Sequence, residues 1–542
     1  INPRFQEYLQ ALARGEIPRK TPHSSWGAAL LYQVTGRINK NEGWKELALP
    51  ILGHHGSLPD VGVAAQYLLD FLAKEPTALQ AMKSYIENSA VKLPPMKVSA
   101  LPPFRRELRI RMLFSALVDA DWLDTEHHFS PENAKEREGW VNLTDLWEQF
   151  QVNQKDMLAK LKARHEHNTP VNRVRREVYE ACLAAATGPQ GIYRLTVPTG
   201  GGKTRSSLAF ALRHALKNKL RRIIVAIPYT SIIDQTAQEY RKIFGDEAVL
   251  EHHSQVQVPE NDEGQLLAAL RFRLATENWD APLIVTTTVQ LFDSLFSNRR
   301  SSVRKLHNLA KSVIILDEVQ TLPPELLEPT LDVLRSLVED YGVTLVLSTA
   351  TQPAFEEARF LRAFEGLEVR EMVPEYQKHF ERLRRVHYEI GQEPISWEDL
   401  AEEVNRYSQV MVVLNTRKDA LALLNELGSD SVTFHLSTLL CGAHRRIILD
   451  EVKRRLAIGE PVRLISTQVV EAGVDIDFPV VYRAFGPLDR IVQAAGRCNR
   501  EGKPAAGKVR VFEPLEGRFI RNLRTWEQEC GHGLPSAGIK TG

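Results

Sequence analysis

The chain has 542 residues, which allows three or four domains, and its 43% content of hydrophobic residues can give each domain a core. The net charge of only +1 excludes nucleic-acid binding through the overall field, so any such binding must use local basic surface. The four dispersed cysteines form no CxxC pair, which argues against a disulfide framework, and no apolar run reaches membrane-spanning length. We therefore expect a soluble cytoplasmic protein without a membrane partner.

Residues 1–165 are predicted to form an all-α front domain. Its clearest pattern is an apolar stripe at helical spacing, which Asp121 continues at i+11, while Asp119 points about 200° away from it. The stripe consists of Ile110, Leu113, Phe114 and Leu117. A carboxylate on an apolar stripe is costly to bury unless something pairs with it, and a metal ion would.

Three histidines stand near glycines in the same region. His54 and His55 lie in ILGHHGSLPD, and His23 lies in KTPHSSWGA. Neutral imidazoles together with a buried carboxylate suit a divalent transition metal, so His23, His54, His55 and Asp121 are the predicted ligands. The alternative is that the histidine pair is only a polar helix end, and Asp119 competes with Asp121 as the carboxylate.

After residue 190, short β-branched runs alternate with amphipathic helices, which indicates parallel sheets covered on both faces. One set of predicted strands occupies 222–227, 282–287, 312–317 and 343–349, and a second occupies 410–414, 462–467, 480–485 and 509–512. We expect two α/β lobes, at 166–375 and 376–515. Residues 516–542 are predicted to be a linker or the remnant of a C-terminal region, and we expect the chain to be a fragment because it begins with Ile.

The segment VPTGGGKT at 197–204 follows an apolar run and precedes an amphipathic helix, as a phosphate-binding loop requires. Its backbone N–H groups would face the phosphates of ATP, Lys203 would reach the β- and γ-phosphates, and Thr204 would ligate Mg²⁺. The predicted ATP-binding residues here are Thr199, Gly200, Gly201, Gly202, Lys203 and Thr204. Val197 replaces the usual leading glycine, and a glycine-rich turn that binds nothing is the alternative.

Two further motifs complete a nucleotide site. VIILDEVQ at 313–320 delivers two carboxylates at the end of a buried strand; Asp317 would hold Mg²⁺ and Glu318 would deprotonate the attacking water. In QAAGRCNR at 493–500, Arg497 and Arg500 are three residues apart and are predicted to share one helix face, from which they would reach the γ-phosphate as arginine fingers. The alternatives are a capping role for the carboxylates and a solvated face for the arginines.

The phosphate-binding loop, DEVQ, STAT (348–351), STQVVEAGVDID (466–477) and QAAGRCNR occur in the order found in superfamily 2 DExD/H-box helicases, and the chain resembles that family. The resemblance implies two RecA-like lobes. It also implies that Ser348, Thr349 and Thr351 couple hydrolysis to lobe movement, that Gly473 and Asp475 contact the nucleotide side, and that Gln493 belongs to the last motif.

Segments at 228–236, 286–295 and 413–420 are similar to the family's strand-gripping segments. Threonines and exposed N–H groups suit phosphate contacts without base readout. The predicted contacts to single-stranded DNA are Thr230, Thr288, Thr416 and Thr467. The alternative for each threonine is a helix cap.

KTPHSSWGA, HHG and LFSALVDADWLDTE, joined to this helicase, resemble the type I CRISPR-associated helicase-nuclease with its HD-type nuclease domain, as does HLSTLLCGAHRRIILDEVKRRL at 435–456. The resemblance implies ATP-driven pulling of single-stranded DNA, metal-dependent cleavage of that DNA, and recruitment by an RNA-guided CRISPR surveillance complex. A phage inhibitor protein is a further expected partner. In that family an upstream histidine and a His-Asp pair also serve the metal site, and they would precede the first residue of this numbering.

Three rival functions remain open from the sequence. The first is a general superfamily 2 helicase with a non-catalytic helical front domain. The second is an HD phosphohydrolase acting on nucleotides, and the third is a protein-binding scaffold with a vestigial ATPase. The intact Lys203, Glu318, Arg497 and Arg500 weigh against the scaffold.

Overall fold

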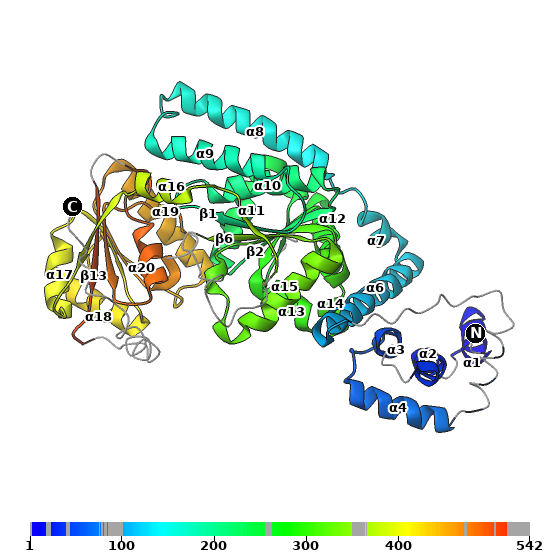
Figure 1. Cartoon of the computed structure of the whole chain (residues 1–542). Coiled ribbons are helices and arrows are strands. Elements are labelled where there is room, and N and C mark those ends of the chain that lie inside the picture. The colour runs from blue at the N-terminus through cyan, green and yellow to red at the C-terminus, as the bar shows by residue number, and fades with distance from the viewer. Residues whose placement is uncertain are drawn as a thin grey trace.

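The structure is a computed structural model that describes residues 3–17, 23–39, 44–74, 76, 80, 84, 101–228, 230–254, 263–349, 364, 366–470, 474–502 and 506–516. The N-terminal helices lie at one end, lobe 2 lies at the other, and lobe 1 lies between them (Figure 1). The predicted order of an all-α front region followed by two parallel α/β lobes is confirmed.

Helices form the front region, and four of them surround a core of mainly tryptophan, alanine and leucine side chains. Trp26, Trp44 and Leu68 are buried there, together with Ile110 from the long helix that follows. The helices are α1 (Pro3–Ala13), α2 (Ser24–Asn39), α3 (Trp44–Gly53), α4 (Val61–Lys74), α6 (Pro103–Phe129), α7 (Pro131–Glu136) and α8 (Leu143–Ala163).

Helix α6 belongs to two cores at once. Ile110 packs in the front region, whereas Phe114 and Val118 are fully buried in the hydrophobic core of lobe 1. The predicted single stripe is therefore wrong at Leu113, which is 37% exposed, because the helix is covered on two faces by different partners. Helix α8 likewise adds Leu146 and Phe150 to a lobe 1 core. The predicted boundary at 165/166 stays a prediction.

Lobe 1 is a parallel sheet whose described strands have the order β3-β4-β2-β5-β6-β1-β7. The strands are β1 (Ile192–Thr196), β2 (Arg222–Ile227), β3 (Leu250–His252), β4 (Leu283–Thr287), β5 (Ser312–Leu316), β6 (Thr344–Thr349) and β7 (Val369–Glu371). The neighbouring strands β1 and β6 pair from Ile192 opposite Leu345 to Thr196 opposite Thr349. Buried residues, many of them β-branched, fill β2 and β5, as expected for a sheet with helices on both faces.

The helices of lobe 1 cover both faces of this sheet, and α8 and α9 lie along one edge of the lobe (Figure 1). They are α9 (Pro170–Ala185), α10 (Lys203–Lys217), α11 (Thr230–Phe244), α12 (Glu263–Asn278), α13 (Thr288–Phe296), α14 (Arg300–Val303) and α15 (Leu327–Tyr341). Short 3₁₀ turns occupy Asp246–Ala248, Leu306–Leu309, Val319–Thr321 and Pro324–Leu326.

Lobe 2 repeats the plan with a second parallel sheet, in which the described strands have the order β10-β11-β9-β12-β13-β8. The strands are β8 (Val386–Ile390), β9 (Gln409–Val413), β10 (Thr433–Leu436), β11 (Val462–Ser466), β12 (Val480–Ala484) and β13 (Gly507–Phe512). The helices are α16 (Tyr376–Arg382), α17 (Trp397–Asn405), α18 (Arg417–Leu427), α19 (Gly442–Ile458) and α20 (Leu488–Ala495), with a 3₁₀ turn at Gln468–Val470.

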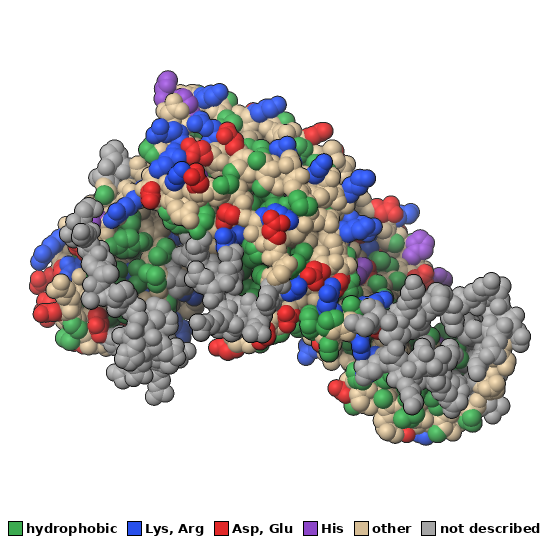
Figure 2. All heavy atoms as spheres, in the orientation of Figure 1, with side chains coloured by type: hydrophobic (Ala, Val, Ile, Leu, Met, Phe, Trp, Pro, Cys, Tyr) green, Lys and Arg blue, Asp and Glu red, His purple; other side chains and the backbone are tan. Residues whose placement is uncertain are grey.

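Two surface properties bear on partners. Lys and Arg side chains gather along the edge formed by α8 and α9 (Figure 2), where Lys155, Lys160, Lys162 and Arg164 are exposed. This is local basic surface on a chain of almost zero net charge, as the composition requires of any nucleic-acid binding. Within the described part of the chain, every helix is too short or too polar to cross a bilayer.

Candidate ATP site and candidate metal centre

The phosphate-binding loop links the C-terminal end of β1 to the first turn of α10. Gly200 (φ +80°) and Gly202 (φ +87°) have left-handed backbone angles that favour glycine. A Cβ on Gly201 would lie 2.6 Å from Val197 Cγ1 and 2.9 Å from the Pro198 carbonyl oxygen. The three successive glycines are therefore a steric requirement, and the N-terminus of α10 faces the space where phosphates would lie.

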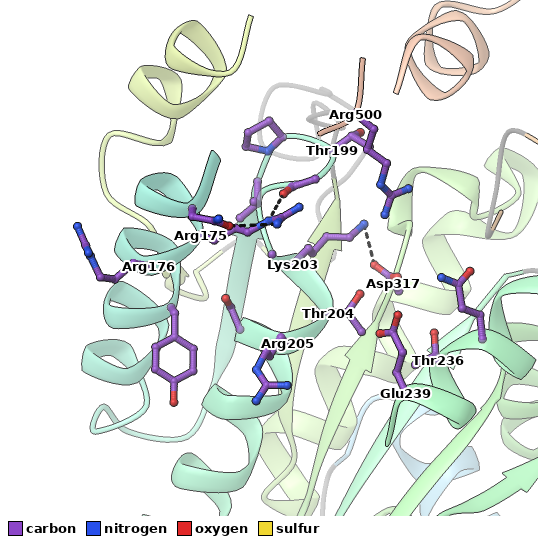
Figure 3. A pocket seen from close by; sticks show the side chains of 18 of the residues that line it. Arg175, Arg176, Thr199, Lys203, Thr204, Arg205, Thr236, Glu239, Asp317 and Arg500 are labelled. Carbon is purple, nitrogen blue, oxygen red and sulfur yellow. Dashed lines mark hydrogen bonds and ion pairs between the residues drawn. The ribbon is translucent and has the colours of Figure 1, made fainter. Parts of the chain in front are cut away.

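Lys203 bridges the two carboxylates at the end of β5, and Figure 3 shows its side chain extending to Asp317. Its Nζ lies 2.9 Å from Asp317 Oδ1 and 2.5 Å from Glu318 Oε1. Burial lowers the pKa of Lys203, but the charges of Asp317 and Glu318 outweigh it and raise the pKa above its usual value. Burial raises the pKa of Glu318, and the Lys203 ammonium reverses this, so the net shift is downward. The site thus holds one cation between two anions.

The carboxylates are also tied to the end of β6. Ser348 Oγ donates to Asp317 Oδ1 at 3.0 Å. Thr349 Oγ1 donates to Gln320 Oε1 at 2.8 Å, and Gln320 Nε2 donates to Glu318 Oε2 at 2.6 Å. A continuous chain of hydrogen bonds therefore runs from the STAT segment to the predicted general base. Thr351, the third residue predicted to act there, lies outside the described residues.

A cavity of about 540 Å³ opens beside the loop and takes its walls from both lobes. Thr204, Asp317 and Glu239 line its lobe 1 side, and the Arg500 side chain extends from lobe 2 toward Lys203 (Figure 3). Gln493 and Arg497 also line it. The three predicted motifs meet at this one cavity. Gly473 lies outside the described residues.

The prediction that Arg497 and Arg500 share a helix face is wrong. Helix α20 ends at Ala495 with Gly496 as its C-cap, and Cys498 forms an isolated parallel bridge with Phe478. The helix does not continue to Arg500 because this bridge holds Cys498 in extended pairing. The left-handed backbone of Asn499 (φ +47°) then turns the chain further away from the helical path. Both arginines nevertheless line the cavity.

Contacts within lobe 2 hold the two arginines of QAAGRCNR in place at the cavity. Arg497 Nε donates to the Val470 carbonyl at 3.1 Å, and Arg500 Nε lies 3.2 Å from Asp475 Oδ1. The buried Gln493 Oε1 has no hydrogen-bond partner among the described residues. An unpaired buried acceptor at a cavity wall suits an incoming donor, since leaving it unpaired costs about 1–3 kcal/mol.

Two arginines that sequence reasoning missed also touch the loop. Arg175 Nε donates to the Gly200 carbonyl at 2.9 Å, and Arg385 Nη2 donates to the Thr199 carbonyl at 2.6 Å. Arg385 also donates to the Arg500 carbonyl and so joins the two lobes. Neither residue belongs to a motif with fixed spacing, so only the fold brings them here.

The three predicted histidine ligands converge in the front region. His23 Nε2 lies 3.1 Å from His54 Nε2 and 2.9 Å from His55 Nε2, and the ligand atoms of all three fall within 4.8 Å of one another. His54 Nδ1 lies 2.7 Å from the Ile51 carbonyl; a proton on Nδ1 that donates there leaves the Nε2 lone pair facing the other rings. Burial, and then the nearby His54, lower the pKa of His23, so its ring is neutral, as a ligand must be.

The structure distinguishes Asp121 from Asp119, the two carboxylates that compete for the metal site. Asp121 Oδ2 lies 4.0 Å from His55 Nδ1 and is half-buried. Asp119 is 3% exposed and faces lobe 1, where its Oδ1 accepts from Arg304 Nε at 2.6 Å. The geometry therefore brings Asp121, and not Asp119, to the histidines. Three imidazoles whose Nε2 atoms converge beside a carboxylate fit a divalent transition metal.

Comparison with known proteins matches both lobes to helicase families. The DEAD/DEAH box helicase family matches residues 174–359, and the CRISPR-associated nuclease/helicase Cas3 C-terminal family matches residues 406–503. The chain is similar to a CRISPR-associated nuclease/helicase Cas3 of Haloferax volcanii, 29% identical over 422 residues, covering 57% of this chain and 44% of that protein. A Streptococcus thermophilus protein with the same description is 21% identical over 562 residues, covering 89% of this chain and 59% of that one.

The chain is similar to CRISPR-associated nuclease/helicases and contains a DEAD/DEAH box helicase match.

Solved structures agree on the fold. A crystal structure of T. fusca Cas3 has a TM-score of 0.64 at 15% identity, covering 94% of this chain and 67% of that one. The same protein with AMPPNP has a TM-score of 0.62 at 17% identity, covering 91% and 64%. The chain spans about half the length of the curated helicase-nucleases that it matches.

The threonines predicted to contact a DNA strand stay predictions. Thr416 is the N-cap of α18 and accepts from Asp419 N at 3.1 Å, the alternative role that the sequence left open. Thr288 and Thr467 are 9% and 4% exposed, and Thr230 begins α11.

A second cluster of metal-ligand types lies in lobe 1, at Asp234, Glu251 and His253. His253 Nε2 lies 2.8 Å from Glu251 Oε1 and 3.4 Å from Asp234 Oδ1. Burial lowers the pKa of His253, but the two carboxylates raise it to about 9. The ring is therefore already a cation paired with two anions, and the cluster is a structural ion network.

Proposed function

We propose that the chain is the motor and part of the nuclease of an ATP-dependent single-stranded DNA translocase that degrades invading DNA in CRISPR interference. The single observation that carries the proposal is the cavity where the phosphate-binding loop, the DEVQ carboxylates and the arginines of lobe 2 meet. A site built from two lobes changes shape with its ligand, so ATP binding and release can open and close the lobes.

For hydrolysis, Lys203 leaves its carboxylate partners and pairs with the β- and γ-phosphates of ATP. Glu318 is then free to orient and deprotonate water, while Arg497 and Arg500 meet the γ-phosphate from lobe 2. Thr204 and Asp317 would hold Mg²⁺, which supplies neutralisation of phosphate charge when bound. The hydrogen-bond chain from Glu318 through Gln320 to Thr349 carries the state of the site to the end of β6.

For cleavage, His23, His54, His55 and Asp121 would hold a divalent transition metal. When bound, such an ion supplies an activated water and neutralises the scissile phosphate. The Ile51 carbonyl holds the His54 ring in the tautomer that leaves Nε2 free, and Asp121 Oδ2 lies 4.0 Å from His55 Nδ1, close enough to join the same site. Burial keeps His23 neutral, so protons do not compete with a metal for it.

The partners follow from this function. Single-stranded DNA would be pulled from lobe to lobe, and the RNA-guided CRISPR surveillance complex would deliver it. The described residues form no evident pattern for reading base sequence. This suits a motor that leaves the choice of target to another complex. A phage inhibitor protein stays a prediction, as does a cytoplasmic location.

The test compares two variants of the full-length protein on the same DNA. Lys203→Ala should abolish DNA-stimulated ATP hydrolysis, and replacement of His54 and His55 by Ala should end metal-dependent cleavage of single-stranded DNA while ATP hydrolysis continues. An unchanged ATPase rate in Lys203→Ala would refute the motor. Persistent cleavage in the histidine variant would place the nuclease elsewhere and favour the rival, a general helicase with a non-catalytic front region.

A further inference from the structure

The candidate metal ligands lie on three elements of the front region: His23 directly precedes α2, and one stretch of lobe 1 contacts the other two elements. His54 and His55 follow α3, and the turn after them is fixed to lobe 1: Leu58 N donates to the Asn298 carbonyl at 2.8 Å, and Ser57 forms an antiparallel bridge with Arg299. The other element is α6, which carries Asp121. Residues 297–304 of lobe 1, here called the clamp segment, contact both.

Arg304 is the clamp segment's contact with α6. It is 1% exposed, and its Nε donates to Asp119 Oδ1 at 2.6 Å. Its guanidinium carbon lies 4.7 Å from the ring centre of Trp122, a distance that gives a cation–π contact. Asp119 and Trp122 flank Asp121 along the helix, so a single buried side chain holds the turn that presents Asp121.

All the polar neighbours that the structure gives the Asp119 carboxylate come from lobe 1. Besides Arg304, Asn278 Nδ2 donates to Asp119 Oδ2 at 3.3 Å, and His307 Nε2 lies 3.4 Å from the same oxygen. Two more contacts fix α6 along its length: Arg111 Nη1 donates to the Leu295 carbonyl at 2.9 Å, and Ser115 Oγ donates to the Arg304 carbonyl at 3.2 Å.

Docking of α6 does not need a buried charge here. Its apolar face already packs in the lobe 1 core through Phe114 and Val118, and Arg105 forms ion pairs with Glu339 and Asp340 of α15. A buried ion pair costs desolvation that apolar packing avoids, and its best-attested use is to fix register. If α6 rotated about its axis by about 100°, the angle between successive residues, Asp121 would turn away from His55.

We propose that Arg304 is a positioning residue for the metal centre, so that lobe 1 of the motor completes the geometry of the nuclease site. The proposal rests on the proposed function, because it assumes that His54, His55 and Asp121 bind a metal. The clamp segment of the motor then sets the distance between the histidines and the Asp121 carboxylate of the nuclease site. Removing Arg304 should weaken metal binding even though no atom of Arg304 touches the metal.

The test is a titration of the full-length protein with Co²⁺, followed by the visible absorption bands of the bound ion. Arg304→Met should weaken Co²⁺ binding by about 10–100-fold, as loss of supporting contacts does at other metal sites, and should change the shape of the bands. DNA-stimulated ATP hydrolysis should stay within about twofold of the wild type. Trp122→Leu removes the stack without stranding a buried charge, and should weaken binding less, in the same direction.

Arg105→Met is the matched control, because it also cuts an ion pair between α6 and lobe 1, far along the helix from Asp121. Its Co²⁺ affinity and band shape should equal those of the wild type. Equal losses in Arg105→Met and Arg304→Met, or no loss in Arg304→Met and Trp122→Leu, would overturn the positioning role. His54→Ala separates the two proposals: if it leaves Co²⁺ binding intact, the metal centre itself is wrong, and with it the nuclease half of the proposed function.

Discussion

Lys203 Nζ lies 2.5 Å from Glu318 Oε1, so the cation predicted to bind phosphate and the carboxylate predicted to deprotonate water neutralise each other. In this arrangement neither group can perform its proposed task. Nucleotide phosphates, which carry more negative charge than one carboxylate, would draw Lys203 away and release Glu318. We therefore expect the pair to keep Glu318, the predicted general base, inactive until phosphates arrive.

Glu318→Gln should separate binding from chemistry. The amide cannot accept the water's proton, so we expect kcat for ATP hydrolysis to fall by roughly 10²–10⁴-fold. Lys203 loses a charged partner and is freer to meet phosphates, so ATP should bind at least as tightly as in the wild type. Single-turnover hydrolysis and equilibrium binding of ATP measure the two effects, and a kcat within a few fold of the wild type would exclude Glu318 as the base.

Gly496 controls how closely lobe 2 approaches the phosphate-binding loop. A Cβ there would lie 2.8 Å from Thr199 Cγ2 and 3.2 Å from the Gln493 carbonyl oxygen. Gly496→Ala should hold the lobes slightly apart and reduce kcat roughly ten- to hundredfold, since small displacements of catalytic groups are costly. Steady-state ATPase kinetics provide the measurement.

Gly442→Ala is the matched control for that substitution. Gly442 begins α19 in lobe 2, where an added Cβ meets nothing within 4 Å. Its kcat should be unchanged. If both alanines reduced kcat alike, the effect would be a general response of lobe 2 and not a matter of contact with Thr199.

Much of the fold follows from local pattern. The eight predicted strands correspond to β2, β4, β5, β6, β9, β11, β12 and β13, because buried parallel strands are continuous apolar runs that the sequence displays directly. Short or edge strands leave no such run: β3 and β7 have three residues each, and β8 has partly exposed side chains throughout. They form because neighbours supply pairing partners, which sequence pattern alone does not indicate.

The residues of the ATP site and the metal centre also differ in how far local sequence could locate them. Lys203, Asp317 and Glu318 lie in motifs whose spacing is set by one strand and one turn, so local sequence located them. The helix predicted for Arg497 and Arg500 was wrong because Phe478, a residue distant in sequence, pairs with Cys498 and ends the helical path. Arg385 and Arg304 were missed since each acts through contacts made only after lobes and domains assemble.

The ion network around His253 gives a prediction for stability. Bonds to Asp234 and Glu251 overcome the effect of burial and raise the pKa of His253 from 6.5 to about 9. A raised pKa in the folded state means that the stabilisation is complete below about pH 6.5, where the histidine is charged in both states, and is lost as pH rises through about 9. His253→Gln should therefore lower the stability of lobe 1 by about 2 kcal/mol at pH 6, and by much less at pH 10.

Thermal unfolding of the wild type and of His253→Gln at pH 6, 8 and 10 would measure this. The gap between their midpoints should be largest at pH 6 and shrink steadily as the wild-type histidine loses its proton. His444→Gln, which changes an exposed histidine on α19, is the control and should track the wild type at every pH. A gap that stays constant from pH 6 to pH 10 would mean that His253 stabilises lobe 1 through packing, since a charge contribution must disappear with the charge.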